Sequence, residues 1–326
     1  MAVLRSTDQA AAEKQVEMLC RMQLIRAFDS MLPDLYTRQL IRGSSHAAIG
    51  QEAVAVGACA ALAGDDYITS THRGHGHTIA KGGDVKRMMA ELLGRQDGYC
   101  RGKGGSMHIA DFSIGMLGAN GIVGGGFGLA GGAALSAQLR GSGQVALCFF
   151  GDGASNQGAF HEVSNLSAIW KLPLILLCEN NQFAMSARVE QMVSVRDLTR
   201  RADAYGFPGI SVDGMDVMAV HDAVTTARLR AREDDGPTLI VATCYRFVGH
   251  FSGDTQHYRT RDEIQRWLER DPISSHRRRL VDSGVLTEDA ADELEHEARR
   301  AVEAALQFAI ASPWPAAEEA WEDLYA

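Results

Sequence analysis

Three short runs of apolar residues, separated by stretches of helical character, constrain the fold of this chain more than any other feature. The runs span residues 145–150, 174–178 and 239–245. A continuous apolar run of this length is typical of a strand that is buried on both faces. Strands that alternate with helices favour a parallel sheet covered by helices. The sequence therefore predicts an α/β fold, a three-layer sandwich around a parallel sheet.

Helical segments are predicted around these strands. The first is expected to begin at an N-cap among residues 6–8, to break near Pro33 and to continue to Gly43. The others are expected at residues 51–62, 86–93, 159–170, 262–268 and 287–308. Residues 94–132 are rich in glycine and are predicted to form a long functional loop. Because no linker or repeat is evident, we expect residues 1–326 to form one domain with helical extensions at both ends.

Charge and composition exclude several classes of partner. The chain has 41 acidic and 32 basic residues, a net charge of −9. An acidic surface repels phosphate backbones and anionic lipids, so we expect neither nucleic acid nor a membrane as partner. No run approaches the roughly 18 apolar residues that a membrane helix needs. The six cysteines form no C-x-x-C pair, which favours reduced thiols in a soluble, cytoplasmic enzyme.

Polar side chains follow two of the predicted strands directly. Gly151-Asp152-Gly153-Ala154 follows the first strand, and Glu179-Asn180-Asn181-Gln182-Phe183 follows the second. Parallel sheets bind ligands beyond the carboxyl ends of their strands. Mg²⁺ prefers oxygen ligands, which a carboxylate, an amide and a backbone carbonyl supply. Flanking glycines and a helix N-terminus after Gly158 favour an adjacent phosphate. The two segments together predict a site for a metal-bound diphosphate.

The spacing of these segments carries a resemblance to a known family. Gly-Asp-Gly is followed by 26 residues and then by Asn-Asn, which resembles the thiamine-diphosphate fingerprint. Further motifs are similar to the α subunits of 2-oxo-acid and acetoin dehydrogenases, and they run in the family's order along most of the chain. These motifs are Gly50-Gln51-Glu52-Ala53, Gly104-Gly105-Ser106-Met107-His108, Asn120-Gly121-Ile122-Val123-Gly124, Val212-Asp213-Gly214-Met215-Asp216, Tyr245-Arg246-Phe247-Val248-Gly249-His250 and Tyr258-Arg259-Thr260-Arg261. The resemblance implies a thiamine-diphosphate-binding fold.

The resemblance also implies which residues bind thiamine diphosphate and Mg²⁺. The cofactor-binding residues it implies are Arg73, Gly121, Val123, Asp152, Gly153, Ala154, Asn181 and Arg246. The implied Mg²⁺ ligands are the side chains of Asp152 and Asn181 and the backbone carbonyl of Phe183. Arginine suits the two diphosphate positions because its guanidinium pairs with phosphate oxygens in a bidentate manner.

Two histidines are implied as catalytic. His250 corresponds to an active-site histidine on a mobile loop, and His46 corresponds to a second one. Imidazole suits both places because it donates or accepts a proton near neutral pH. The resemblance leaves the roles of His72, His75 and His108 open.

The family implies partners and a substrate as well. No glutamate in the matched motifs fills the role of the one that activates the cofactor, so a β subunit is expected to supply it in an α2β2 heterotetramer. The product acyl group is expected to pass to a lipoyl acyltransferase. The segment from Gly249 to Gln256 is most similar to acetoin dehydrogenases, which places acetoin first as the small-molecule substrate, pyruvate second and branched-chain 2-oxo acids third.

Two other classes of function fit the sequence less well. Gly126-Phe127-Gly128-Leu129-Ala130-Gly131 spells G-x-G-x-x-G, which is typical of nicotinamide enzymes. However, no predicted strand precedes it, and the match alone is weak. A non-catalytic scaffold is disfavoured because Asp152, Asn181, Arg73 and His250 are all present. The sequence predicts an oxidoreductase.

Overall fold

A five-stranded parallel sheet forms the centre of the computed structural model, which describes residues 2–323, with side chains from residue 9. Its strands are β1 (Tyr67–Thr69), β2 (Ala146–Gly151), β3 (Leu174–Asn180), β6 (Gly209–Asp213) and β7 (Thr238–Thr243). They lie in the order β1-β2-β3-β7-β6, and every neighbouring pair is parallel. The predicted α/β fold is confirmed, and the three predicted runs form the three central strands.

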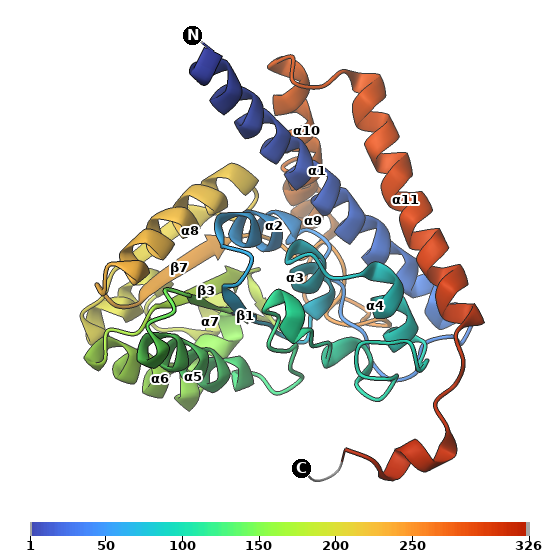
Figure 1. Ribbon diagram of the computed structural model, residues 1–326, viewed down its shortest axis with the longest axis horizontal. Helices are drawn as coiled ribbons and strands as arrows, with labels where there is room; N and C mark the ends of the chain where they lie inside the picture. The colour runs from blue at the N-terminus through green and yellow to red at the C-terminus, as the bar shows by residue number, and fades with distance from the viewer. Residues whose placement is uncertain (1, 324–326) are drawn as a thin grey trace.

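Helices cover both faces of this sheet (Figure 1). One face packs against α2 (Glu52–Ala61) and α8 (Val217–Arg232), and the other packs against α5 (Gly125–Arg140) and α6 (Gly158–Ile169). Alternate residues of β2 point to opposite sides, with Leu147 and Phe149 in one core cluster and Cys148 and Phe150 in the other. The two core clusters on opposite faces of the sheet form the predicted three-layer arrangement.

The layer of α2 and α8 depends on one glycine. A Cβ atom at Gly57 would lie 2.5 Å from the Val217 carbonyl oxygen and 2.9 Å from the Val220 Cβ. Neither distance leaves room for a methyl group, so the two helices approach each other more closely than alanine would allow.

Long helices from both ends of the chain pack together beside the sheet (Figure 1). The first, α1 (Ala2–Thr37), begins before the expected N-cap and continues through Pro33. The predicted break near Pro33 and the extension to Gly43 are therefore wrong. Leu32 and Leu35 are buried on either side of the proline, and their packing keeps the last turn helical although one N–H donor is missing. The helix α11 (Glu288–Ala311) lies along α1 and α4 (Val85–Leu92).

The remaining helices and strands are short. They are α3 (Gly74–Ala80), α7 (Val189–Met192), α9 (Arg261–Leu268), α10 (Pro272–Asp282), β4 (Phe183–Ala184) and β5 (Ala187–Arg188). Five 3₁₀ segments complete the described elements, namely η1 (Gly105–Met107), η2 (Phe112–Ile114), η3 (Asp152–Asn156), η4 (Leu198–Tyr205) and η5 (Ala317–Trp321).

The glycine-rich segment is shorter than predicted. Between α4 and α5 the chain contains only η1 and η2, but α5 begins at Gly125 rather than after residue 132. Its first turns contain Gly125, Gly126 and Gly128, which hide the helical signal because glycine has low helix propensity. No helix in the described part of the chain is both long and apolar enough to cross a membrane.

Candidate functional site

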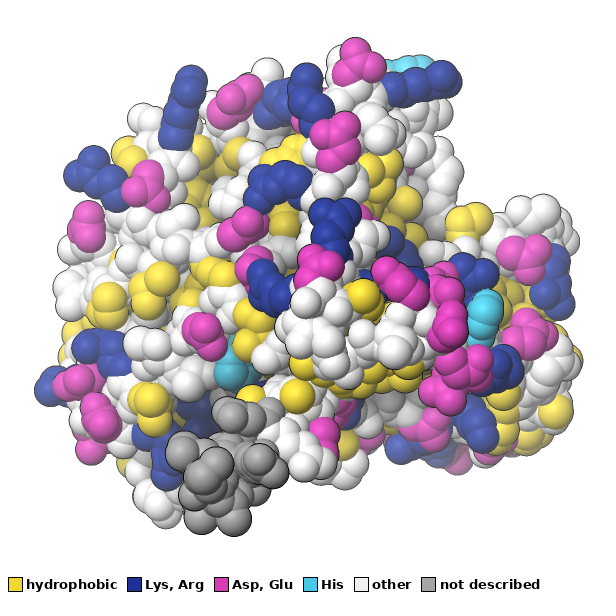
Figure 2. Space-filling view, turned by 90° about the horizontal axis from the view of Figure 1, so that it is seen from above, with side chains coloured by type: hydrophobic (Ala, Val, Ile, Leu, Met, Phe, Trp, Pro, Cys, Tyr) yellow, Lys and Arg dark blue, Asp and Glu magenta, His cyan; other side chains and the backbone are white. Residues whose placement is uncertain are grey.

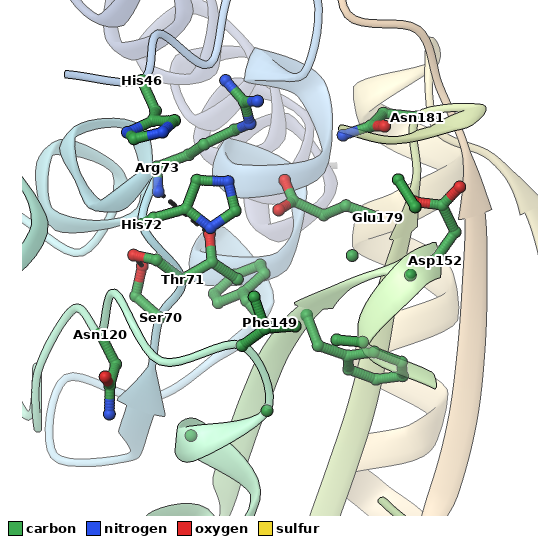
Figure 3. A pocket seen from close by; sticks show the side chains of 18 of the residues that line it. His46, Ser70, Thr71, His72, Arg73, Asn120, Phe149, Asp152, Glu179 and Asn181 are labelled. Carbon is green, nitrogen blue, oxygen red and sulfur yellow. Dashed lines mark hydrogen bonds between the residues drawn. The ribbon is translucent and has the colours of Figure 1, made fainter. Parts of the chain in front are cut away.

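A cavity of about 420 Å³ opens at the carboxyl ends of β2 and β3. Figure 3 shows His46, His72 and Arg73 on one side of it, with Asp152, Glu179 and Asn181 facing them from the strand ends. The cavity is lined by every residue that the sequence assigned to the site, which are His46, Arg73, Gly121, Val123, Asp152, Gly153, Ala154, Asn181, Phe183, Arg246 and His250. The fold thus brings together segments as far apart in the sequence as His46 and His250, while the chemical role of each residue stays a prediction.

On the side of the strand ends, Asp152 carries a buried carboxylate that lacks a partner. Its side chain is 1% exposed, and its Oδ2 has no hydrogen-bond partner among the described residues. Burial raises the pKa of this carboxyl from 3.8 to about 6. An ionised carboxylate in such a place is costly unless a cation compensates it. The position therefore suits a metal ion.

Asn181 and Phe183 lie next to this carboxylate. The Asn181 Nδ2 donates a hydrogen bond of 2.6 Å to Oε1 of the buried Gln51, and its Oδ1 accepts one of 3.2 Å from the Phe183 backbone N–H. A Cβ atom at Gly153 would lie 2.7 Å from the Ala184 Cβ, so glycine is needed where β4 approaches η3. The donor set of carboxylate, amide and carbonyl oxygens fits Mg²⁺.

Across the cavity, two arginines are buried without acidic partners. Arg73 is 3% exposed and Arg246 is 1% exposed, and neither forms a salt bridge with any residue that the structure describes. Burial, together with the charge of Arg246, lowers the pKa of Arg73 from 12.5 to about 9. Burial likewise lowers the pKa of Arg246. Two unpaired buried cations of like sign require an anion. A diphosphate held between this pair and a metal at Asp152 fits the observed charges.

The two arginines also hold His250. Its Nδ1 lies 3.2 Å from Arg73 Nη2 and 3.3 Å from Arg246 Nη1. The His250 backbone N–H donates to Asp254 Oδ2 at 2.6 Å, and Asp254 also accepts a hydrogen bond from the Tyr258 hydroxyl. Burial and the neighbouring arginines lower the pKa of His250 from 6.5 to about 4. The ring is therefore neutral at pH 7 and is fixed in orientation by contacts on two sides.

The rim of the cavity is apolar. Gly121 and Val123 line it, and the side chains of Ile122 and Val123 are 74% and 50% exposed. Large exposed apolar side chains next to a ligand cavity are typical of a surface that a ligand or partner covers.

Several residues in or next to the cavity were not assigned from the sequence, among them Gln51, Glu179 and His72. Gln51 contacts Asn181 across 130 positions, which no local pattern could indicate. Glu179 lines the cavity and lies 3.3 Å from His77 Nε2, so it is paired. His72 lines the cavity and directly precedes Arg73, but the resemblance left its role open.

Two histidines whose roles the sequence left open lie outside the residues that line this cavity. His75 is fully buried between Asp29, at 2.8 Å, and the Ser106 hydroxyl, at 2.9 Å. His108 packs over its own loop and lies 3.1 Å from the Gly104 carbonyl oxygen. Asp29 also accepts a hydrogen bond from the Ala48 N–H at 2.6 Å. The Asp29–His75–Ser106 chain therefore joins the segment of His46 to the segment of Met107.

Comparison with known proteins agrees with this geometry. Residues 20–318 match the family model described as the dehydrogenase E1 component. The chain is 46% identical to the α subunit of acetoin:2,6-dichlorophenolindophenol oxidoreductase from Bacillus subtilis, over 96% of this chain and 94% of that protein. It is 44% identical to the protein of the same name from Cupriavidus necator, over 100% of this chain and 99% of that one. It is 40% identical to the pyruvate dehydrogenase E1 component α subunit from Rhizobium meliloti, over 93% and 87% of the two chains. The chain therefore belongs to the dehydrogenase E1 component family, whose members are thiamine-diphosphate-dependent oxidoreductases.

Proposed function

We propose that this chain is the α subunit of a thiamine-diphosphate-dependent enzyme that cleaves acetoin and passes the acetyl unit to a lipoyl acyltransferase. The observation that carries the proposal is the pairing, within one cavity, of the unpartnered Asp152 carboxylate with two buried arginines that lack acidic partners. A metal diphosphate supplies the missing charges on both sides. The two acetoin relatives, which align over nearly their whole length, support the substrate.

We assign the predicted contacts to residues that line this cavity. Asp152, Asn181 and the Phe183 carbonyl would hold Mg²⁺, and Arg73 and Arg246 would bind the diphosphate oxygens. The backbone of Gly153 and Ala154 would approach the diphosphate, and that of Gly121 and Val123 would meet the aminopyrimidine ring. Bound thiamine diphosphate supplies the electron sink that carbon–carbon cleavage next to a carbonyl requires.

His250 would act on the substrate from the opposite wall. A guanidinium only donates hydrogen bonds, so the His250 Nδ1 between the two arginines accepts. In the neutral ring the proton then lies on Nε2, and this N–H is the group available to a substrate oxygen. His250 would therefore donate a hydrogen bond, or a proton, to the oxygen on which charge develops.

A second chain is expected to complete the site. Of the carboxylates that line the cavity, Asp152 would be committed to the metal and Glu179 is paired with His77. Neither is free to activate the aminopyrimidine ring, so we assign that glutamate to a β subunit. The exposed apolar rim at Ile122 and Val123 supports a partner at this surface, and the names of the relatives as α subunits support it too.

Pyruvate is the alternative substrate. The pyruvate dehydrogenase α subunit from Rhizobium meliloti is 40% identical, against 46% and 44% for the two acetoin relatives. Phe251 directly follows His250 and is 42% exposed. The pattern of the segment from Gly249 to Gln256, in which it lies, favours acetoin as the substrate.

The test is to co-purify the chain with its β subunit and to assay it with Mg²⁺, thiamine diphosphate and 2,6-dichlorophenolindophenol as electron acceptor. Acetoin, pyruvate and branched-chain 2-oxo acids are compared by kcat/KM. We expect acetoin to give the highest value and the isolated chain to be inactive. Faster cleavage of pyruvate would overturn the substrate, and full turnover by the isolated chain would overturn the need for a partner.

A further inference from the structure

Three imidazole rings gather at the wall of the cavity that faces the strand ends. The ring centroids of His46, His72 and His250 lie 4.7, 5.0 and 5.4 Å apart in pairs. One ring nitrogen from each histidine lies within 4.8 Å of the others. The sequence implies catalytic roles for His250 and His46, but neither it nor the proposed function gives His72 a role.

Two of these rings offer buried nitrogens that have no partner. His46 is 8% exposed, and its Nδ1 lacks a hydrogen-bond partner among the described residues, as does the buried Nε2 of His72. Burial, followed by the charge of Arg73, lowers the pKa of His46 to about 3 and that of His72 to about 2. Both rings are neutral at pH 7, so each offers one donor and one acceptor. Buried polar atoms without partners at a ligand cavity indicate a polar ligand.

A metal ion is a poor match for this cluster. The spacing of the nitrogens would suit one, but the Nδ1 of His250 already faces Arg73 and Arg246. Two guanidinium charges next to the rings repel a cation. The cluster therefore suits an uncharged ligand that both donates and accepts hydrogen bonds.

We propose that His72, together with His46 and His250, binds the hydroxyl and carbonyl oxygens of an α-hydroxyketone and sets the preference for this uncharged substrate class over 2-oxo acids. This inference rests on the proposed function and assigns a specificity-determining residue to it. A hydroxyl donates a hydrogen bond to an imidazole lone pair and accepts one from an imidazole N–H. The neutral rings therefore match both its donor and its acceptor. A carboxylate only accepts hydrogen bonds. It would face imidazole lone pairs, to which it cannot donate, as well as N–H groups.

The remaining charges of the cavity support the same preference. Arg73 and Arg246 are the only arginine or lysine residues among those that line it. In the proposed function both are bound to the diphosphate. A substrate carboxylate beside His72 would lose its water without gaining a cation from the described part of this chain, which is costly.

The test compares wild type with His72→Phe and His72→Gln in the purified α/β enzyme. Phenylalanine keeps the ring and removes both nitrogens, whereas glutamine keeps a donor and an acceptor. We measure kcat/KM for acetoin and for pyruvate with 2,6-dichlorophenolindophenol, or the inhibition constant of pyruvate against acetoin if pyruvate is not turned over. Inhibition by 2,3-butanedione, which replaces the hydroxyl with a second carbonyl, measures recognition of the hydroxyl itself. Thermal stabilisation by thiamine diphosphate and Mg²⁺ reports on cofactor binding.

We expect His72→Phe to lower kcat/KM for acetoin about 10-fold or more, the loss expected for a buried hydrogen bond whose partner is left unpaired. The value for pyruvate should change less than about 3-fold, and the advantage of acetoin over 2,3-butanedione should shrink. His72→Gln should recover part of the loss, and the cofactor-induced thermal shift should stay unchanged.

Equal losses for acetoin and pyruvate, or a lost thermal shift, would overturn the inference and leave His72 as a structural or cofactor contact. The wild-type enzyme decides the proposed function separately. If it prefers pyruvate to acetoin, the proposed function fails, and the inference fails with it. If it prefers acetoin and His72→Phe keeps the same preference, only the inference fails.

Discussion

Asn181 carries an amide with two chemically different ends, and its surroundings decide which end faces the proposed metal. The Gln51 Oε1 accepts from the Asn181 Nδ2 at 2.6 Å, so the Asn181 Oδ1 is turned the other way, where the Phe183 N–H donates to it at 3.2 Å. The Gln51 side chain is fully buried and cannot easily move aside. Gln51 therefore acts as a positioning residue for the amide oxygen that would bind Mg²⁺.

We predict that Gln51→Leu weakens binding of Mg²⁺ and thiamine diphosphate by about 10-fold or more, the range found when a residue that orients a metal ligand is removed. The amide of Asn181 would then be free to rotate. The measurement is a calorimetric titration of the α/β enzyme with cofactor and Mg²⁺. Gln51→Glu is the control, since its carboxylate still accepts from Asn181 Nδ2 and should retain more of the affinity. Equal affinities for wild type and Gln51→Leu would contradict the positioning role.

The buried histidines predict how stability depends on pH. The pKa of His46 falls from 6.5 to about 3 because of burial and the charge of Arg73. Below pH 6.5 the unfolded chain takes up a proton at this position that the folded chain does not. The stabilisation is therefore complete above about pH 6.5 and is lost as the pH falls toward 3, with a slope of up to about 1.4 kcal/mol per pH unit for one site.

We expect His46→Asn to flatten this dependence, because asparagine does not titrate. The free energy of unfolding is measured by urea titration of the cofactor-free protein at several values between pH 7 and 5. His257→Asn is the control, since this histidine lies outside the cluster. A pH dependence that His46→Asn leaves unchanged would show that the titrating groups lie elsewhere.

At the scale of elements, the strands that the sequence predicts are those buried on both faces. The strands β2, β3 and β7 were predicted because both of their faces are buried and their apolar runs are continuous. The edge strand β6 was missed because its burial alternates, and β1 was missed because it has only three residues. The helix α3 has the sequence Gly-His-Gly-His-Thr-Ile-Ala, which carries no apolar period. The helix α3 is buried because other elements pack around it, and a local sequence pattern does not predict such contacts.

The glycine-rich segment after α4 is organised by one carboxylate. Glu91 is fully buried, and it accepts hydrogen bonds of 2.7 to 2.9 Å from the backbone N–H groups of Cys100, Gly102, Gly104 and Gly105. Hydrogen bonds to a charged acceptor are the stronger kind. The segment leads directly to Met107, which lines the cavity. A side chain on a helix thus fixes a loop that has no regular structure of its own.

We predict that Glu91→Gln lowers the free energy of unfolding by roughly 2–4 kcal/mol, because the neutral amide offers one acceptor oxygen and leaves buried N–H groups unpaired. Hydrogen exchange at residues 98–105 should increase. Chemical denaturation and exchange measurements test both effects. Glu233→Gln, at an exposed helix end, is the matched control and should change stability by less than about 0.5 kcal/mol. Unchanged exchange in residues 98–105 would contradict the role of Glu91.

At the scale of the molecule, the strand pattern could place the two strand-end segments of the site, whereas the residues of its walls came from the resemblance of motifs and their contacts with one another were not predictable. Asp152 and Asn181 were predictable because each follows a buried strand, and parallel strands bring their carboxyl ends together. The contacts of Gln51 with Asn181 and of Arg73 with His250 join segments 130 and 177 positions apart. Such contacts depend on how helices and loops pack over the sheet, and no motif specifies that. That residues 1–326 form a single domain stays a prediction.

The surface carries both charged side chains and large exposed apolar ones. Figure 2 shows basic and acidic side chains mixed over the face seen from above. By contrast, α5 and α6 expose large apolar side chains, with Leu129, Leu139 and Ile169 between 48% and 78% exposed. The helix α5 begins directly after Ile122 and Val123 at the cavity rim. We call Ile122, Val123 and Leu129 the rim surface, and we expect the β subunit to cover it because exposed apolar groups of this size favour association.

This surface gives the last prediction. Ile122→Glu and Leu129→Glu should each raise the dissociation constant for the β subunit at least about 10-fold, because a carboxylate would be buried in an apolar contact. The thermal stability of the isolated chain should change little, since both side chains are exposed. Leu229→Glu on α8 is the control: Leu229 is 54% exposed but belongs to the helical layer on the other face of the sheet, so its substitution should leave association unchanged. Binding of the β subunit is measured by calorimetry in the presence of cofactor and Mg²⁺. The opposite result would be that the rim variants bind the β subunit as tightly as wild type while Leu229→Glu binds it more weakly. The partner would then contact the layer of α2 and α8, and the cavity would open to a surface that the β subunit does not cover.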